Sequence, residues 1–293
     1  MVPIMTIVAL ALVLASAFAH ATWNYLAKSS RDTYAFTWAF TSLAGLIYLP
    51  VSVTLSRTWP SLQALSFIAV TAFLHVLYFG LLNASYSRAD LSLVYPVARG
   101  TGLALIPLGA VWLLQEHISF LGTLSILIIV SGVLTVHSRG RGRAALVGLG
   151  KSLGESGSRL AVLTGVVIAS YSLWDAHALS VTSPILLDAG IFAGQAILVA
   201  PFVLIKKRTA VRREWCERPF AVIAAAILSP LAYFLVLTAI TLSGVAYVAP
   251  TREIGMVFGV LLGWHSLKEG HAANRLLGSA LIVAGVFGLA LSP

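Results

Sequence analysis

Charged residues are scarce in this sequence of 293 residues: only 10% are Asp, Glu, Lys or Arg, while 59% are hydrophobic. A soluble domain of this size carries about 25% charged residues, because its surface must face water. The polar surface is therefore too small to coat a soluble globule, and lipid must be the outer solvent. The sequence excludes a large soluble domain and predicts an all-α integral membrane protein.

Several kinds of chemistry are missing as well. Cys216 is the only cysteine, which excludes an intramolecular disulfide and a cysteine metal cluster. The sequence has no phosphate-cradling loop with a Walker lysine, no zinc-ligand spacing and no nucleophile motif. We therefore expect no cofactor, no metal site, no ATP hydrolysis and no enzymatic activity. The net charge of +9 lies mostly in loops between apolar runs, which indicates membrane topology and argues against nucleic-acid binding.

What is abundant is long apolar runs, and they predict ten membrane-spanning helices. The expected spans are 3–27, 34–55, 62–84, 91–114, 120–137, 160–180, 184–205, 219–241, 245–265 and 273–291. The segment 138–158 is rich in Gly, Arg, Lys and Ser, which is typical of a flexible linker. The predicted domains are a first five-helix repeat (1–137), this basic Gly/Ser-rich linker (138–158) and a second five-helix repeat (159–293).

The two halves resemble each other, which indicates a gene duplication. Because five spans per half is an odd number, the second half must enter the membrane in the opposite sense to the first. Inverted repeats are typical of alternating-access transporters, with the substrate near the midplane between the repeats. This architecture favours a secondary carrier over the two alternatives, a passive channel and an intramembrane enzyme or lipid-handling protein. The matching positions, at shifts of 151 to 155 residues, are Arg99 and Arg252, Gly102 and Gly255, Glu116 and Glu269, Gly132 and Gly285, Trp23-Asn24 and Trp174-Asp175, and 78–84 and 233–239.

The sequence also resembles a known family in three stretches: SRADLSLVYPVARG (87–100), EHIS (116–119) and HATWN (20–24) with Lys28. These resemble EamA-type transporters of the drug/metabolite transporter superfamily. The resemblance implies a ten-helix fold in the cytoplasmic membrane, with a cavity lined mainly by spans 1, 3, 4, 6, 8 and 9. It also implies transport of an amino acid, metabolite, drug or organic anion. The repeat departs from symmetry at one point, because Pro96 aligns with Ala249 and Pro250 lies one position further on.

Arg99 and Arg252 are the clearest candidate site residues, because they occupy equivalent positions inside apolar spans. An arginine at a helix centre costs about 2.5 to 3.5 kcal/mol on insertion scales, so its presence suggests a function. Each follows a proline, which frees backbone carbonyls and can open a helix beside a cavity. Two guanidinium groups can bind a carboxylate, phosphonate or sulfonate in bidentate fashion. The alternative is that each arginine pairs within the protein, for example Arg252 with Glu253.

Aromatic and polar side chains on other spans complete the predicted substrate site. His20, Trp23 and Asn24 are three or four residues apart, so they share one face of the first span. An aromatic surface with a few fixed polar groups is what a small-molecule cavity needs. For the tryptophans the alternative is the interfacial aromatic belt, and a lone histidine such as His75 is more often a packing residue. The predicted substrate-binding residues are Arg99, Arg252, His20, Trp23, Asn24, Tyr78, Tyr95, Trp174 and Tyr233.

Carboxylates inside spans are the candidate proton carriers, and we assign this role to Asp175 and Glu253. For Glu253 the alternative is a permanent partner for an arginine. Glu116 and Glu269 lie at turns between spans, where a structural role as a helix cap is expected. Small residues recur in spans 5 and 10 and predict that these spans pack together. These residues are Gly122, Gly132, Gly278 and Gly285.

The expected partners are a small-molecule substrate and membrane lipid, without nucleic acid, and the protein is expected to be a monomer or homodimer. Its orientation follows from the basic loops. Sixteen of the 19 Lys and Arg residues lie in loops after odd-numbered spans, whereas Arg57 alone lies in the other loops. The positive-inside rule then predicts that both termini lie outside the cytoplasm, although many proteins of the resembled family have cytoplasmic termini.

Overall fold

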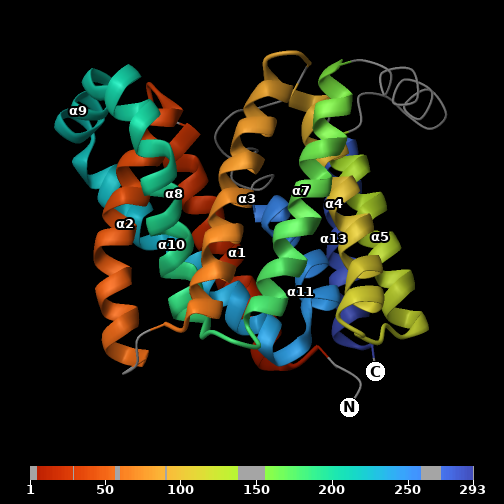
Figure 1. Ribbon diagram of the computed structural model, residues 1–293. Helices are drawn as coiled ribbons and strands as arrows, with labels where there is room; N and C mark the ends of the chain where they lie inside the picture. The colour runs from red at the N-terminus through yellow and green to blue at the C-terminus, as the bar shows by residue number, and fades with distance from the viewer. Residues whose placement is uncertain are drawn as a thin grey trace.

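The computed structural model describes residues 5–28, 30–56, 60–89, 91–137, 156–258 and 272–292. These residues form helices joined by short turns (Figure 1). The helices are α1 (Ile7–Lys28), α2 (Thr33–Ser56), α3 (Leu62–Tyr86), α4 (Leu91–Leu113), α5 (Phe120–His137), α7 (Ser156–Ala178), α8 (Pro184–Lys206), α9 (Arg208–Glu217), α10 (Pro219–Ser243), α11 (Val245–Thr251) and α13 (Ala272–Ala290).

The helices have the length and composition of membrane spans. Within the described residues, six helices are long and apolar enough to cross a bilayer: α1, α2, α3, α7, α8 and α10. Three shorter apolar stretches lie in α4, α5 and α13. Large apolar side chains such as Trp112, Ile205 and Phe220 lie on the outside, where lipid is their natural solvent. A helical, multi-pass membrane protein is confirmed, whereas the count of ten spans stays a prediction.

Most predicted helix boundaries fall within a few residues of the observed ones, but three expectations need correction. The helix α9 was missed, because its ten residues carry several charges and no apolar run. The helix α7 begins at Ser156 rather than at residue 160, so 156–158 belong to a helix and not to the linker. The rest of the predicted linker, 138–155, lies outside the described residues. The predicted span 245–265 is interrupted after Thr251.

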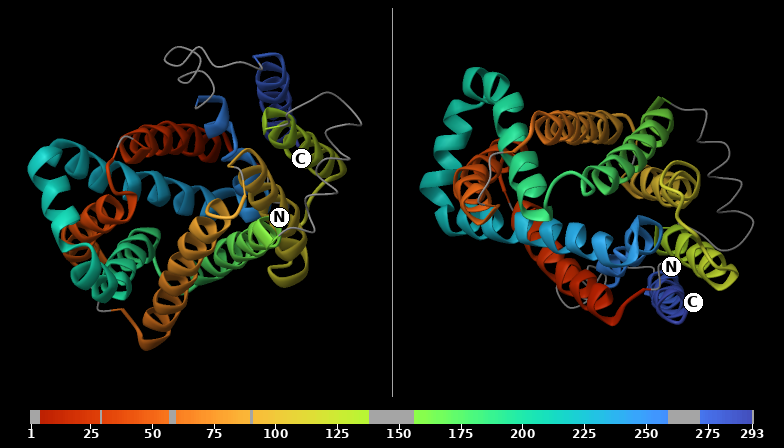
Figure 2. Two further views of the ribbon diagram at one scale, coloured as in Figure 1. Left: turned by 90° about the horizontal axis from the view of Figure 1, so that it is seen from above. Right: turned by 60° about the horizontal axis from the view of Figure 1, so that its bottom comes forward.

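Helices of the two halves pack against each other in a reciprocal pattern. The first helix of one half lies along the third helix of the other, in the pairs α1 with α10 and α7 with α3. The second helices, α2 and α8, pack together, and so do the last helices, α5 and α13. Figure 2 shows the α2, α8 and α9 group on one side of the molecule and the α5 and α13 pair on the other. The chain ends lie at the same end of the molecule (Figure 1).

Glycines allow α5 and α13 to approach closely, as the sequence predicted. A Cβ atom on Gly132 would lie 2.8 Å from the carbonyl oxygen of Gly278, and one on Gly285 would lie 2.8 Å from that of Ser125. Backbone atoms at these distances leave no room for a side chain. The glycine face is therefore occupied within the chain. Gly122 contacts the α4–α5 turn and the C-terminal end instead, near Ile118 and Ser292.

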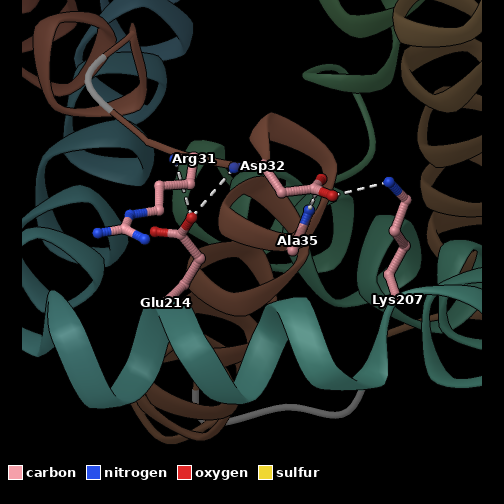
Figure 3. Close-up of polar contacts among 5 residues, drawn as sticks. All are labelled: Arg31, Asp32, Ala35, Lys207 and Glu214. Carbon is pink, nitrogen blue, oxygen red and sulfur yellow. Dashed lines mark hydrogen bonds and ion pairs between the residues drawn. The ribbon is translucent and has the colours of Figure 1, made fainter.

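A polar network fixes the α1–α2 turn against α9 at the end of the molecule opposite the termini (Figure 3). Buried Glu214 accepts hydrogen bonds from the backbone N–H groups of Arg31 and Asp32, at 3.0 and 3.1 Å. Asp32 caps α2 by accepting from Ala35 N, and Lys207 Nζ lies 2.7 Å from its other oxygen. Partial burial opposes ionisation, but the bonds from Lys207 and Ala35 outweigh it and hold the pKa of Asp32 below its usual value. The network attaches a segment of the first half to the second.

Glu116 connects the halves at the other end of the molecule. Its two carboxylate oxygens accept hydrogen bonds from Val245 N and Ala246 N, both at 2.9 Å, and so cap α11. The preceding Gly244 has φ +73°, and a Cβ there would lie 2.7 Å from the Glu116 carboxylate. The expected structural role is thus observed, although the capped helix belongs to the other half. Glu269, its predicted counterpart, lies outside the described residues.

We expect Glu116→Ala to lower the thermal stability of the protein. The substitution leaves two buried N–H groups at the start of α11 without acceptors, and each such group costs about 1 to 3 kcal/mol. The melting temperature of the purified protein in detergent measures this effect. Glu217→Ala is the matched control, because Glu217 forms an exposed ion pair with Arg31 that contributes little. Equal melting temperatures for the two variants would contradict the capping role.

Candidate functional site

The break in the span that starts at residue 245 positions two predicted site residues. The helix α11 ends at Thr251, and Arg252 and Glu253 form a turn before helix resumes at 254–258. Backbone bonds here join residues three apart, as in Gly255 N to Arg252 O at 3.0 Å. The helix opens beside Pro250, as expected, whereas α4 continues past Pro96 from Leu91 to Leu113. Discontinuous helices of this kind expose backbone groups to a binding site within the membrane.

Arg99 from α4 meets this turn. Its Nη1 atom lies 3.3 Å from Oε1 of Glu253, and the glutamate side chain is only 4% exposed. The pairing alternative for Glu253 is therefore observed, but with Arg99 from the other half rather than with the adjacent Arg252. In the described part of the chain, no acidic side chain forms an ion pair with Arg252. The charged cluster of Arg99, Arg252 and Glu253 therefore contains two guanidinium groups and one carboxylate, which pairs with Arg99.

Two pockets adjoin this charged cluster, and Arg99, Arg252 and Glu253 line both of them. The first lies between α4, α7 and the turn after α11, and the second lies between α1 and the same turn. Each has about 300 Å³ of space between atoms, including the part that is open to the outside. The first pocket is completed by Leu103, Ile106, Ile168, Tyr171, Ser172 and Ala249, and the second by Ser16, Ala17, His20 and Gly255.

Asp175 is the centre of a second polar cluster. Its side chain is fully buried, and it accepts hydrogen bonds from the Thr71 hydroxyl on α3 and the Tyr233 hydroxyl on α10. The His75 Nδ1 atom lies 2.9 Å from the carbonyl oxygen of Thr71 and 3.3 Å from its hydroxyl. The His75 ring packs on Tyr171, with 4.2 Å between ring centroids. Three helices of the two halves therefore hold one carboxylate.

The two clusters are joined through aromatic rings. The Cζ atom of Arg252 lies 5.4 Å from the centroid of the Tyr233 ring, whose hydroxyl binds Asp175. Such a cation over an aromatic face is attracted by the ring electrons. Tyr171 contributes to both clusters, because it lines the first pocket and stacks on His75. A continuous polar and aromatic path thus runs from Arg99 to Asp175.

The structure places Trp23, Asn24 and Trp174, which were also predicted as site residues, outside the two pockets. Trp23 Nε1 donates to His20 Nδ1 at 3.2 Å, and its ring packs on Phe40 of α2. Asn24 donates to the carbonyl oxygen of His20 at 2.8 Å. Trp174 Nε1 donates to the Phe67 carbonyl at 3.1 Å.

Two tyrosines lie close to the charged cluster. The Arg99 guanidinium lies 5.7 Å from the ring centroid of Tyr95, and the ring centroids of Tyr78 and Tyr171 are 5.9 Å apart. Sequence reasoning missed Thr71, because a threonine in an apolar helix gives no signal of its own. The described residues contain no group of three or more His, Cys, Asp or Glu side chains suited to a metal ion.

Comparisons with known proteins bear on the fold and the family. No curated protein sequence gives a significant match. A crystal structure described only as that of a protein superimposes with a TM-score of 0.73 at 17% identity, over 97% of this chain and 96% of that chain. That likeness shows the fold alone. Residues 155–291 match the model of the EamA-like transporter family. The resemblance that the sequence motifs indicated is thereby confirmed by the match of the second half of this multi-pass membrane protein to the EamA-like transporter family.

Proposed function

We propose that the protein is a secondary transporter that moves a small organic metabolite across the cytoplasmic membrane by alternating access. The observation that carries this proposal is the cluster of Arg99, Arg252 and Glu253, contributed by both halves beside a broken helix. Glu253 pairs with Arg99, and Arg252 has no acidic ion-pair partner among the described residues, so the cluster retains a net positive charge. A carboxylate, phosphonate or sulfonate group neutralises that charge, and Arg252 offers it a planar fork of donors. The proposed substrate is therefore an organic anion or an amino acid.

The reciprocal packing of helices supports two inverted five-helix repeats as the basis of alternating access. The pair α1 with α10 has its counterpart in α7 with α3, and α3 with α8 has its counterpart in α10 with α2. Equivalent halves of opposite orientation give two conformations of similar free energy, one open to each side. The substrate then binds at the charged cluster, and the change between the two conformations makes this binding site accessible from the other side of the membrane.

A binding screen followed by counterflow tests this proposal. Purified protein is screened for thermal stabilisation by amino acids, carboxylates, phosphonates, sulfonates and, as a contrast, cationic drugs. A stabilising compound is then loaded into proteoliposomes, and uptake of labelled compound from outside is followed. We expect stabilisation by an anionic compound and saturable counterflow. Non-saturable flux would instead indicate a passive channel, and conversion of the compound would indicate an enzyme or lipid-handling protein; either result contradicts the proposal.

We further propose that transport is coupled to protons at Asp175. This buried carboxylate is bound by hydroxyl donors from two helices, so any relative movement of α3, α7 and α10 changes its hydrogen bonds. Asp175→Asn is expected to abolish uptake driven by a pH gradient and to leave counterflow partly intact. Proteoliposomes with an imposed pH gradient measure the first property, and those without one measure the second. A variant that still responds fully to the gradient would exclude Asp175 as the coupling site.

The proposed orientation places the basic end of the molecule in the cytoplasm and both termini outside. The α1–α2, α3–α4 and α8–α10 connections lie at the end opposite the termini (Figure 1), and they carry many of the basic residues. Alkaline phosphatase fused after Pro293 is expected to be active in cells. Fluorescence from a green fluorescent protein fused at the same position would show that the termini are inside, and would reverse the orientation.

A further inference from the structure

A second carboxylate, Asp188 on α8, is buried close to the Asp175 cluster and has no role in the transport site described above. Its side chain is 0% exposed. In the described part of the chain, no group forms a hydrogen bond with either of its oxygens. The environment is apolar, because the neighbouring Leu187 and Ile191 pack in a buried cluster with Phe67 on α3. Asp188 nevertheless lies within electrostatic range of Asp175.

The two aspartates have different surroundings. Asp175 receives two hydroxyl hydrogen bonds, which stabilise an ionised carboxylate. Asp188 receives none from the described residues, and an isolated ionised carboxylate in an apolar interior is very costly. The negative charge of nearby Asp175 disfavours ionisation of Asp188 further. Burial without donors and the nearby Asp175 therefore both favour the protonated form of Asp188.

The titratable groups around Asp188 do not supply a compensating positive charge. The helices packed against α8 carry Tyr48 on α2, His75 on α3 and Tyr233 on α10, and the exposed His177 on α7 packs on Phe67 of the same apolar cluster. Tyr48 is within electrostatic range of Asp188, but its hydroxyl donates to the Ile227 carbonyl. His75 and Tyr233 belong to the Asp175 cluster. The charged residues of α9 follow the opposite end of α8, beyond Lys206.

We infer that Asp188 is a proton-binding site of this protein: it holds a proton in this conformation and forms a coupled pair with Asp175. The inference rests on the proposed proton coupling and adds a second proton-binding group to it. The proton resides on a carboxyl oxygen of Asp188 while Asp175 is ionised. A movement of α8 relative to α7 that changes the separation of the two groups, or admits water, alters which of them holds the proton. No oxidant or co-substrate is required, because only a proton is bound and released.

Infrared spectroscopy of the purified protein in lipid nanodiscs tests this inference without any transport substrate. The carbonyl stretch of a protonated carboxyl is separate from the bands of a carboxylate. At pH 7 we expect the difference between wild type and Asp188→Asn to contain one protonated carboxyl band. Asp175→Asn is the matched control, and it should keep this band at pH 7. As the pH is then raised, the band should disappear at a lower pH than in the wild type, because the neighbouring negative charge is gone.

The outcomes separate this inference from the proposed function. A protonated band that persists in Asp188→Asn and disappears in Asp175→Asn would place the proton on Asp175 and overturn the inference. A wild-type protein with no such band at pH 7 would overturn it as well. If Asp188→Asn cannot be purified, the spectrum of Asp188→Ser can be subtracted from that of the wild type instead, because serine also lacks a carboxyl group. Failure of the ligand screen and of counterflow would remove the proposed transport function without changing the infrared result.

Discussion

Arg99→Ala is expected to abolish transport of the anionic substrate and to lower the melting temperature of the protein. The substitution removes one donor group of the site and leaves Glu253, only 4% exposed, without its partner. Loss of one partner of a buried ion pair costs about 3 to 5 kcal/mol, because the other charge remains buried. Arg99→Lys keeps the charge but loses the planar fork, so it should fold while binding the substrate more weakly. Uptake and thermal unfolding of the same preparations measure the two effects.

A double variant separates stability from binding. Arg99→Ala combined with Glu253→Gln removes both charges, so much of the lost stability should return while transport stays absent. Arg88→Ala is the matched control, because Arg88 is exposed in the turn after α3 and, among the described residues, its guanidinium bonds only to the carbonyl of Ala84, at 3.0 Å. Arg99→Ala with the affinity and rate of the wild type would show that Arg99 has no part in the substrate site.

Substitution of Gly132 is expected to cause a large loss of stability that grows with the size of the new side chain. A Cβ atom there would lie 2.8 Å from the Gly278 carbonyl oxygen and 2.9 Å from the backbone nitrogen of Ile282. Because these are backbone atoms, α5 and α13 must separate to admit even a methyl group. Overpacking typically costs about 1 to 3 kcal/mol, so Gly132→Ala should lower the melting temperature measurably, and Gly132→Leu should prevent isolation of folded protein.

Gly80 on α3 provides the control for this experiment, because a Cβ atom there meets nothing within 4 Å. Gly80→Ala is expected to be neutral or stabilising, since alanine favours a helix by up to about 1 kcal/mol over glycine. Size-exclusion profiles after heating compare the variants in one detergent. A Gly132→Ala protein as stable as Gly80→Ala would show that the α5–α13 contact is not tight in the membrane.

The sequence predicted those features that depend directly on burial in lipid, namely the positions of the apolar helices and the charged side chains inside them. Length and hydropathy locate most helices, and the rarity of charge in a span identifies Arg99 and Arg252, which the fold does bring to one cluster. The same reasoning could not find α9, whose place depends on tertiary contacts of Glu214 and Lys207. It also could not pair Glu253 with Arg99, because that contact joins residues 154 positions apart.

Asp188 illustrates a second kind of limit. Its sequence neighbours resemble those of any apolar helix, and its position one turn inside α8 is compatible with a water-facing residue near a helix end. Only the packing of neighbouring helices shows that the carboxyl group is enclosed and lacks donors among the described residues. Thr71 is similar, because its hydroxyl acquires importance from an aspartate 104 positions away.

The cap that Glu116 provides for α11 restricts how the protein can change shape. Since the turn after α4 holds the first residues of α11 through two backbone bonds, these segments must travel together during any rearrangement. A further bond, from Ser119 N to the Tyr247 hydroxyl at 3.2 Å, strengthens this attachment. In the proposed transport cycle, an exit for substrate at the end of the molecule that holds the termini therefore has to form between other helices. In that proposed cycle, the break at Arg252 and Glu253 is then the point at which residues 254–258 can change their angle to α11 while α11 itself stays fixed.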